Sequence, residues 1–457
     1  MPFKCHHLDK WEYMNLDLCE EVLEHSSRCV VFIGGASSSG KSFCAKNLKR
    51  VLEGNGHKAL VVSTDNYNKG ISGIITDKVA EKYFGGDLPN REKVVREVKS
   101  VLLKTPFSKK FDRDCLDQIK PKLASFLAPA DLSKYLDGCA EEIKHLNFDE
   151  PDVYDLSSVA TDIKALLAGK TVSCKKYSKV VSEQVPAHSH YDGSKYQVLI
   201  VEGIYVLSDH LLDRFDRGMA VTNFIEGSPK SLFLRRVIRD NKITSSPSYY
   251  TIGMYFHNIV KSYNETIIPS RDNAMVIFNN DMTFAELREG NLYLTKDRVK
   301  VTNPLFIQEM LNKAKLLSTT FQKDIYFTGI GEPSDFNNLL RLRELSTDGG
   351  KTYVPSSLVN KGSPKARRDG KVIRPINVLL KEGDFFKVFG SEKDFLDNMA
   401  AAGFAIDRQV FKVKRRITYD GYRFTISDFR GEGVWLEFAD PDLPLKVRDE
   451  FISEASE

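Results

Sequence analysis

A loop rich in glycine and serine constrains this chain more than any other feature of its 457 residues. The loop follows the apolar run Cys29-Val-Val-Phe-Ile-Gly, precedes a helical stretch, and fits the pattern G-x-x-x-x-G-K-[ST]. In this pattern, glycines let backbone N–H groups surround phosphate oxygens, and the helix N-terminus faces the anion. A serine-rich turn could match by accident, but a strand before the loop and a helix after it are the required context. The loop residues are Gly35, Ala36, Ser37, Ser38, Ser39, Gly40, Lys41 and Ser42.

The loop predicts a site for a nucleoside triphosphate with Mg²⁺. We expect Lys41 to reach the β and γ phosphates and Ser42 to ligate the metal. Asp65 and Glu202 end two further predicted strands, and the carboxyl ends of parallel strands form the edge where ligands bind. Asp65 is therefore a candidate to take a proton from a hydroxyl, and Glu202 to hold magnesium or its water. On this evidence alone, Asp65 fits a turn or N-cap residue equally well, and Glu202 fits a surface acid.

Strands and helices alternate through the first two thirds of the chain. Short apolar runs predict buried strands, and helical periods fill the segments between them. This alternation predicts an α/β fold with a doubly wound parallel sheet across residues 29–300. Residues 77–146 are charged and helical in period, so we expect an inserted helical subdomain there, and residues 1–28 predict an N-terminal helical extension. The expected strands are 29–34, 58–64, 196–202, 220–226 and 274–278, and the expected helices include 41–53, 228–242 and 248–268.

The pattern changes after about residue 320. A helix at 304–316 predicts a connector within residues 301–322. Strand-like runs with turn signals follow, interrupted by one helix at 391–402, and they predict a second domain at 323–445, an antiparallel β-barrel. The expected strands are 323–328, 338–346, 351–359, 372–381, 408–419, 421–429 and 434–438.

Composition excludes several classes of protein. The net charge of +4 gives no reason to expect sequence-independent nucleic-acid binding by the whole chain. The seven cysteines lack paired C-x-x-C spacing, which favours reduced thiols over disulfides or a zinc site. The first 28 residues are polar, so we expect no secretory signal, and no apolar run approaches the ~18 residues of a membrane helix. These features predict a cytoplasmic protein without a membrane partner.

Several further motifs resemble the uridine kinase and phosphoribulokinase group of P-loop kinases. The resemblance covers residues 28–281 apart from the insertion. It implies that ATP is the phosphoryl donor. The matching segments are Gly34-Gly-Ala-Ser-Ser-Ser-Gly-Lys-Ser, Ser63-Thr-Asp-Asn-Tyr, Asn147-Phe-Asp-Glu-Pro-Asp152, Val201-Glu-Gly-Ile, Arg235-Arg-Val-Ile-Arg-Asp240 and Ile268-Pro-Ser.

The resemblance also implies roles for single residues. Asp65 would be the general base for a 5′-hydroxyl, and Asp149 would bind ribose hydroxyls. Tyr177 would lie near the nucleobase. Arg236 and Arg239 would steady the phosphates of donor and acceptor.

The chain departs from the family pattern at two places. The family's Y-D-F-x-x-H-S-R segment is Tyr177-Ser-Lys-Val-Val-Ser-Glu-Gln184 here, so Ser182 stands at the position of the base-contacting histidine and Gln184 at that of the arginine. The lid sequence R-G-R-D is missing after Asp240, where Lys242 is the only nearby cation. These departures argue against uridine itself as the acceptor, although they leave ATP binding untouched.

The second domain resembles the CYTH fold of triphosphate tunnel metalloenzymes, in which basic residues inside an antiparallel barrel grip a polyphosphate. Arg341 and Arg343 share one strand face by their spacing, as do Lys414 and Arg416, and such basic faces turned inward would repel each other without an anion. Spacing alone favours outward, solvated charges, whereas the downstream Asp428 and Leu-Glu437 pattern favours a tunnel. The hallmark E-x-E-x-K appears only as Asp324-Ile-Tyr326-Phe-Thr328, which implies weaker metal binding. The residues that carry the resemblance are Arg341, Arg343, Lys361, Arg374, Lys414, Arg415, Arg416, Asp428, Trp435 and Glu437.

The order of the two domains resembles the two-domain triphosphate tunnel metalloenzymes best known from plants. The chain ends in Phe451-Ile-Ser-Glu-Ala-Ser-Glu, so we expect no C-terminal membrane anchor like theirs. Three hypotheses stay open: an ATP- and Mg²⁺-dependent kinase acting on a nucleoside-like hydroxyl, a pyrophosphate or triphosphate hydrolase acting in the barrel, and a non-catalytic nucleotide or polyphosphate sensor. We favour the kinase. The insertion could serve as a lid, a partner surface or a contact between copies in a homo-oligomer.

Overall fold

The computed structural model of the protein describes two compact units, one up to Asp281 and one from Asn291 onward. None of the helices in these described parts combines the length and apolar character needed to cross a membrane. The described residues are 2–106, 109–187, 189–243, 252–253, 255–281, 291–294, 298–328, 340–360, 371–374, 377–379, 388–438, 443 and 445–456.

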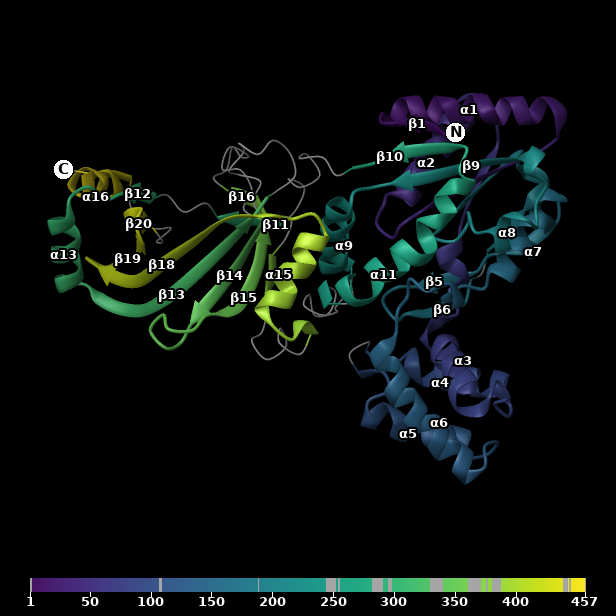
Figure 1. Ribbon diagram of the computed structural model, residues 1–457, viewed down its shortest axis with the longest axis horizontal. Coiled ribbons are helices and arrows are strands. Elements are labelled where there is room, and N and C mark those ends of the chain that lie inside the picture. Colours follow the sequence, from purple (N-terminus) through teal and green to yellow (C-terminus); the bar gives the residue numbers. More distant parts are fainter. Residues whose placement is uncertain are drawn as a thin grey trace. The chain divides into compact units, whose positions relative to one another are not determined.

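A six-stranded parallel sheet forms the centre of the first unit (Figure 1). All five strands expected from the apolar runs are present, and the parallel sheet is confirmed. Long apolar strands can pair in parallel because helices cover both faces and remove them from water. In sheet order the strands are β1 (Phe3–Cys5), β10 (Val276–Asn279), β9 (Ala220–Glu226), β2 (Cys29–Gly35), β8 (Val198–Glu202) and β3 (Ala59–Ser63).

Alternate residues of β2 enter two different cores, which makes the sheet doubly wound. Val31 and Ile33 pack with helices α1 (Leu8–His25) and α2 (Lys41–Gly54), whereas Val30 and Phe32 belong to the larger core on the opposite face. Because successive side chains of a strand point to opposite faces, a run with no polar residue is buried on both sides. Helix α2 begins directly after the loop, so the sheet and helix fix the loop between them.

The N-terminal residues form part of this unit. Strand β1 pairs with β10 at the edge of the sheet, and Trp11 of α1 is fully buried, with its Nε1 donating to Asn223 Oδ1 at 2.9 Å. The segment expected as a helical extension therefore adds a strand to the sheet and a layer to its core.

Helices fill the region of the expected insertion. Helix α3 begins at Gly70, earlier than the sequence suggested, and its buried face packs against the helices that follow (Figure 1). Ion pairs also join α3 to the rest of the unit, since Lys78 lies 2.7 Å from Glu150. The helices are α3 (Gly70–Phe84), α4 (Arg91–Leu102), α5 (Arg113–Leu123) and α6 (Pro129–Glu142).

An antiparallel sheet of eight strands forms the second unit, as expected for a barrel-like domain. In sheet order the strands are β12 (Arg298–Lys300), β20 (Gly433–Phe438), β19 (Tyr422–Phe429), β18 (Ile406–Tyr419), β13 (Lys315–Phe327), β14 (Leu340–Ser346), β15 (Val354–Asn360) and β17 (Asn377–Leu379). A separate pair joins β11 (Asn291–Leu294) to β16 (Lys371–Arg374), and helix α15 (Glu392–Ala401) occupies the predicted place.

The two faces of this sheet differ in chemistry. Phe424, Ile426 and Leu436 on one face pack with α13 (Pro304–Lys313) and α16 (Leu445–Ser456). Helix α13 thus belongs to the core of the second unit, and β12 pairs with β20 there. The structure differs here from the expected boundary at residue 300 and from the expected connector at 301–322. The opposite face is mostly polar.

Candidate functional site

The phosphate loop bends sharply at two glycines at the carboxyl end of β2. Gly35 has φ +134° and Gly40 has φ +98°, which are backbone conformations that favour glycine. A Cβ at Gly35 would overlap the carbonyl oxygen of Ile225, and one at Gly40 would overlap Nδ2 of Asn280. Asn280 also donates from Nδ2 to the backbone oxygen of Ser39 at 2.7 Å. The glycines are therefore needed both for the turn and for the close approach of β9 and of the residue that follows β10.

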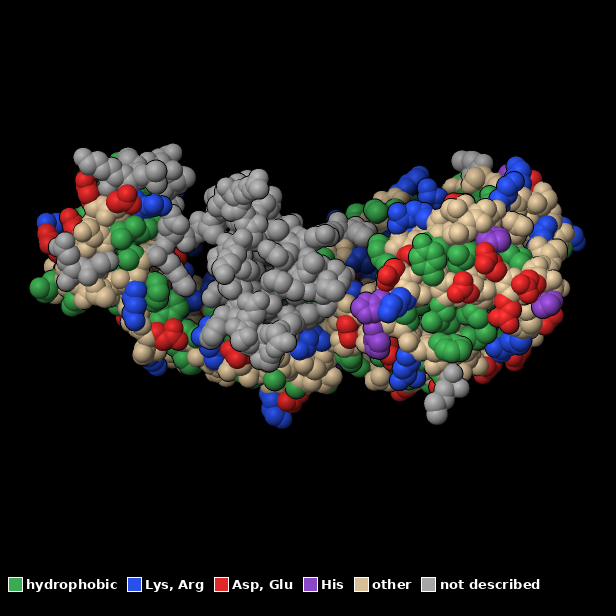
Figure 2. Space-filling view, turned by 90° about the horizontal axis from the view of Figure 1, so that it is seen from above, with side chains coloured by type: hydrophobic (Ala, Val, Ile, Leu, Met, Phe, Trp, Pro, Cys, Tyr) green, Lys and Arg blue, Asp and Glu red, His purple; other side chains and the backbone are tan. Residues whose placement is uncertain are grey.

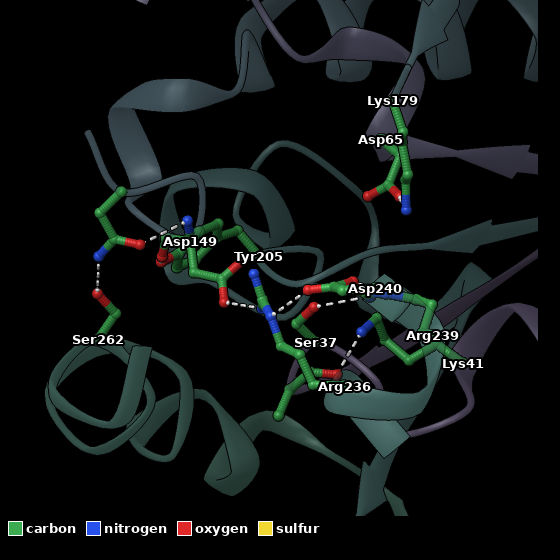
Figure 3. A network of polar contacts seen from close by, with 12 residues as sticks. Ser37, Lys41, Asp65, Asp149, Lys179, Tyr205, Arg236, Arg239, Asp240 and Ser262 are labelled. Atoms are coloured by element: carbon green, nitrogen blue, oxygen red, sulfur yellow. Dashed lines mark hydrogen bonds and ion pairs between the residues drawn. The ribbon is translucent and has the colours of Figure 1, made fainter. Parts of the chain in front are cut away.

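Lys41 lies folded onto its own loop. Its Nζ donates to the backbone oxygen of Ala36 at 2.6 Å, and the side chain is buried (Figure 3). Burial lowers the pKa of this ammonium, and the carboxylates of Glu202 and Asp65 oppose that effect. An ammonium that is buried with only a carbonyl partner gains strongly from a phosphate anion.

Ser42 and Glu202 lie together beside the loop. The Ser42 hydroxyl donates to Glu202 Oε1 at 3.1 Å, across from α2 to the end of β8. Burial raises the pKa of the Glu202 carboxyl, Asp65 raises it further, and Lys41 lowers it. A hydroxyl and a carboxylate placed this close fit a magnesium ion, which prefers oxygen ligands and retains several waters.

Asp65 stands at the end of β3 in the short helix η1 (Thr64–Tyr67), with an ammonium beside it. Lys179 Nζ lies 2.8 Å from Asp65 Oδ2 (Figure 3). Burial raises the pKa of the Asp65 carboxyl, but Lys179, Lys41 and Arg239 together outweigh burial and lower it. Asp65 is therefore ionised at neutral pH, as a proton acceptor must be.

Asp149 is buried and paired with a guanidinium. Arg236 Nη1 lies 2.8 Å from Asp149 Oδ2, and burial of Arg236 is outweighed by Asp149 and Asp240, which raise its pKa. Asn147 holds the turn, because its Oδ1 accepts from the backbone N–H of Asp149 at 3.0 Å and its Nδ2 donates to Ser262 at 2.8 Å. The Tyr205 hydroxyl donates to the backbone oxygen of Asp149 (Figure 3).

Arg239 connects helix α9 (Pro229–Ile243) to the phosphate loop. Its Nη1 donates to Ser37 Oγ at 3.3 Å, and its Nε donates to Asp240 Oδ1 at 2.8 Å. Asp240 also lies 3.5 Å from Arg236 Nε. One carboxylate therefore neutralises both arginines, which stand one helical turn apart.

Tyr177 belongs to a small hairpin of β5 (Lys176–Ser178) and β6 (Glu183–Val185). Its backbone N–H donates to Asn66 Oδ1 at 3.2 Å, which places the hairpin next to Asp65. Burial raises the pKa of its hydroxyl, and Ser182 opposes this by hydrogen bonding. Ser182 thus contacts Tyr177 itself, and the hairpin lies at the cleft although the family's histidine and arginine are replaced.

The structure brings most predicted residues of the first unit into one cleft and adds others. Lys41, Ser42, Asp65 and Glu202 lie at the carboxyl ends of β2, β3 and β8, and α9 brings Arg236 and Arg239 to the loop. Sequence reasoning missed Lys179, Asp240, Tyr205 and Asn280. Asp240 was signalled by its place directly after Arg239. The other three approach the cleft only through the fold.

A buried carboxylate surrounded by cations marks the polar face of the second sheet. Asp324 is fully buried, and Arg343 binds it with Nε at 2.8 Å and Nη2 at 2.9 Å. Arg341 Nη1 lies 3.5 Å away, and Lys412 donates to the same carboxylate. Burial raises the pKa of Asp324, but these cations lower it well below its usual range. Burial lowers the pKa of Lys412 to about 7.

Lys414 continues the basic face, a name used here for Arg341, Arg343, Lys412 and Lys414. Its Nζ lies 2.9 Å from Glu437 Oε1, which also accepts from Ser427 Oγ at 2.8 Å. Among the described residues, these four basic side chains lie against two acids, Asp324 and Glu437. Both acids are engaged by cations, and no group of three or more metal-ligating His, Cys, Asp or Glu side chains occurs in the described parts of the chain.

Four predicted residues of the barrel site are not part of the basic face as the structure describes it. Asp428 pairs with Val413 in the register of β18 and β19, whereas Lys414 pairs with Ser427. Asp428 therefore lies on the face opposite to the basic face, which corrects the expectation that it joins this site. Arg416 shares the side of Lys414 but is exposed at the end of the strand. Lys361 and the side chain of Arg374 lie outside the described residues.

Comparisons with known proteins agree with this geometry. Residues 105–284 match the model of the phosphoribulokinase and uridine kinase family. A uridine kinase from Mannheimia succiniciproducens is 28% identical over 29% of this chain and 58% of its own length. The inorganic pyrophosphatase TTM2 of Arabidopsis thaliana is 25% identical over 47% of this chain and 30% of its own length. The chain thus spans less than two thirds of these relatives.

Among solved structures, a possible uridine kinase from Bacillus stearothermophilus aligns with 57% of this chain and 96% of its own, at 14% identity and a TM-score of 0.31. The family match covers the signature around Asp149, the strand of Glu202 and the helix of Arg236. Together with the parallel sheet, it confirms the resemblance found in the motifs. The chain is similar to the phosphoribulokinase and uridine kinase family over residues 105–284, and this match, the antiparallel second sheet and the similarity to plant pyrophosphatases support a two-domain, kinase plus CYTH-like architecture.

Proposed function

We propose that the first unit is an ATP- and Mg²⁺-dependent kinase that transfers the γ-phosphoryl group to the hydroxyl of a nucleoside-like acceptor. The observation that carries the proposal is the convergence of an ionised base, Asp65, and the phosphate-binding Lys41 at one edge of one sheet. Similarity to uridine kinases supports this choice of reaction class. The family match over residues 105–284 supports the coarser conclusion, a P-loop enzyme that uses a nucleotide.

In the proposed reaction, Asp65 accepts the proton of the acceptor hydroxyl, whose oxygen forms a bond to the γ-phosphorus. The bond between that phosphorus and the β–γ bridging oxygen breaks, and ADP leaves. Positioned cations stabilise the charge that spreads over the transferring group. Lys41 and Arg239 are placed for this at the phosphate loop, and Arg236 stands between them and Asp149.

Ser42 and Glu202 would hold the magnesium ion beside the loop. When bound, the ion would neutralise phosphate charge. Asp149 would bind acceptor hydroxyls through its carboxylate, which lies 2.8 Å from Arg236 Nη1. Tyr177 would lie along the acceptor, since its hairpin is joined to the segment that carries Asp65.

The test follows the label of [γ-³²P]ATP in a mixture of the full chain, Mg²⁺ and a pool of nucleosides and their derivatives. We expect label on a phosphorylated acceptor with the unaltered chain and none with Lys41→Ala. The double variant Lys414→Ala with Arg416→Ala should leave that transfer in place. Label that appears only as free phosphate and persists in Lys41→Ala would refute the proposal.

The basic face favours a second candidate function, the binding of a polyphosphate in the second unit. Arg341, Arg343 and Lys414 stand with the partly protonated Lys412 against Asp324 and Glu437, which leaves an excess of positive charge that an anion would neutralise. The similarity of the chain to a pyrophosphatase supports hydrolysis as an alternative activity. Both Asp324 and Glu437 are tied to cations, so we propose binding rather than rapid hydrolysis. Titration with tripolyphosphate should show binding that Lys414→Ala with Arg343→Ala abolishes and Lys41→Ala leaves intact.

A further inference from the structure

Lys179 occupies a position in the cleft that the proposed reaction does not explain. Its Nζ lies 2.8 Å from Asp65 Oδ2 (Figure 3), and 47% of the Lys179 side chain is exposed to solvent. Elsewhere on the first unit, positive and negative side chains are interspersed over the visible surface (Figure 2). The ammonium of Lys179 lies directly beside the proton acceptor. It lowers the pKa of Asp65 and so makes Asp65 a weaker base.

The fold holds this lysine in place. Lys179 lies in the turn that connects β5 to β6. One end of this hairpin bonds to Asn66, next to Asp65, and the other end bonds to helix α3. Ile71 donates its backbone N–H to Ser182 O at 3.0 Å. The fully buried Glu183 accepts from the N–H of Ser72 at 2.7 Å and from its hydroxyl at 2.8 Å. These hydrogen bonds fix the hairpin on α3 and so hold the backbone of Lys179 in place beside Asp65.

During the proposed reaction, Lys179 loses its negatively charged partner. When Asp65 takes the proton of the acceptor, it becomes neutral and stops pairing with the ammonium. The other acids are engaged, since Asp149 and Asp240 bind arginines and Glu202 lies on Ser42. An ammonium that has lost its carboxylate partner attracts another negative charge next to the reacting hydroxyl.

We propose that this charge belongs to the acceptor, and that Lys179 selects a nucleoside-like compound that carries a carboxylate or phosphate near the hydroxyl to be phosphorylated. The inference rests on the proposed function and narrows its substrate class. The acceptor anion draws Lys179 away from Asp65 as it binds. The base is then freed of its ammonium only when an anionic acceptor is present, and a neutral acceptor leaves the base paired.

The test measures binding of matched neutral and anionic compounds to the full chain by calorimetry, with Mg²⁺ and a non-hydrolysable ATP analogue present. Uridine is compared with its 6-carboxylate, orotidine, and with uridine 3′-phosphate, so the two anion types are separate arms. The variants are Lys179→Met, the charge-retaining Lys179→Arg, and Lys176→Met as control. Lys176 is exposed on the same hairpin and outside the cleft.

We expect at least one anionic compound to bind about 10-fold or more tightly than uridine, the effect of one charge-assisted hydrogen bond. Lys179→Met should remove this preference, while Lys179→Arg and Lys176→Met should keep most of it. The arm that binds identifies the anion as carboxylate or phosphate. Equal binding of neutral and anionic members, a preference that survives Lys179→Met, or binding of none of them would each overturn the inference.

Transfer of label from ATP separates this inference from the proposed function. Label on uridine at a rate that Lys179→Met lowers equally for neutral and anionic acceptors would mean that Lys179 serves the transferring phosphoryl group, and the selection would be refuted while the kinase stands. A preference for the anion that depends on Lys179, without transfer to any acceptor, would refute the kinase and keep the ligand class.

Discussion

Asp324→Asn tests whether buried charges hold the second unit together. The carboxylate is fully buried and bound by Arg343 through two hydrogen bonds of 2.8 and 2.9 Å, with Arg341 and Lys412 beside it. Loss of one partner from a buried ion pair costs about 3–5 kcal/mol, and the carbonyl oxygen that asparagine keeps recovers about 1 kcal/mol. We therefore expect the free energy of unfolding of this unit to fall by about 2–4 kcal/mol.

The two tryptophans allow this unit to be followed by itself. Trp11 lies in the first unit and Trp435 in β20 of the second, so a Trp11→Phe background makes fluorescence report the second unit alone. Urea unfolding would compare Asp324→Asn with Asp407→Asn in that background. Asp407 is half-exposed and 3.9 Å from Arg408 Nε, so its loss should cost under about 0.5 kcal/mol.

The fall of the free energy of unfolding at low pH is a second measurement on the same variant. The surrounding cations hold the pKa of Asp324 below the ~3.9 of an unfolded aspartate. A lowered folded-state pKa gives stability that is present above pH ~4 and lost as pH falls toward the folded value. Asp324→Asn should remove this part of the acid-side loss. If Asp324→Asn unfolds within 0.5 kcal/mol of its parent, or follows the same acid limb, the argument from buried charge is wrong.

Two further predictions concern the first unit. Gly40→Ala should weaken ATP binding about 10-fold or more, because φ is +98° and the new Cβ would overlap Asn280 Nδ2, whereas Gly54→Ala at the other end of α2 meets open space and should leave calorimetric ATP binding unchanged. Lys179→Met should raise the pKa of Asp65 by removing its ammonium partner, so the acid limb of the pH profile of kcat/KM should move to higher pH; an unmoved limb would show that Asp65 is not the base.

Much of the fold could be predicted because its strands carry the signal locally. The run at Cys29 and the run ending at Glu202 are buried on both faces, which gives almost uninterrupted apolar residues, and the run ending at Glu226 is apolar apart from Thr222, Asn223 and the final glutamate. Strand β1 was missed because it has three residues and gains its pairing from β10, far along the chain. The domain boundary was displaced for the same reason, since only pairing with β20 makes a strand of β12.

Site residues could be predicted where a sequence motif fixes their position in the fold. They could not be predicted where the packing of a hairpin or the register between strands decides which residues meet. Loop residues and Asp65 follow strand ends, so their meeting follows from a parallel sheet. Lys179 reaches Asp65 only because a hairpin folds onto α3, which no spacing indicates. Asp428 was placed on the wrong face because the register across the turn after Tyr419 decides which side it takes.

The most direct test of the account is the turnover of the full chain with Asp65→Asn, once the labelling experiment has named the acceptor. Asp152→Asn, an exposed acid of the same signature segment as Asp149, is the control. We predict that Asp65→Asn lowers kcat by about 100-fold or more, the range of a lost general base, with ATP affinity nearly unchanged, and that Asp152→Asn behaves as the unaltered chain. Turnover by Asp65→Asn at the unaltered rate would contradict the assignment of phosphoryl transfer to this cleft.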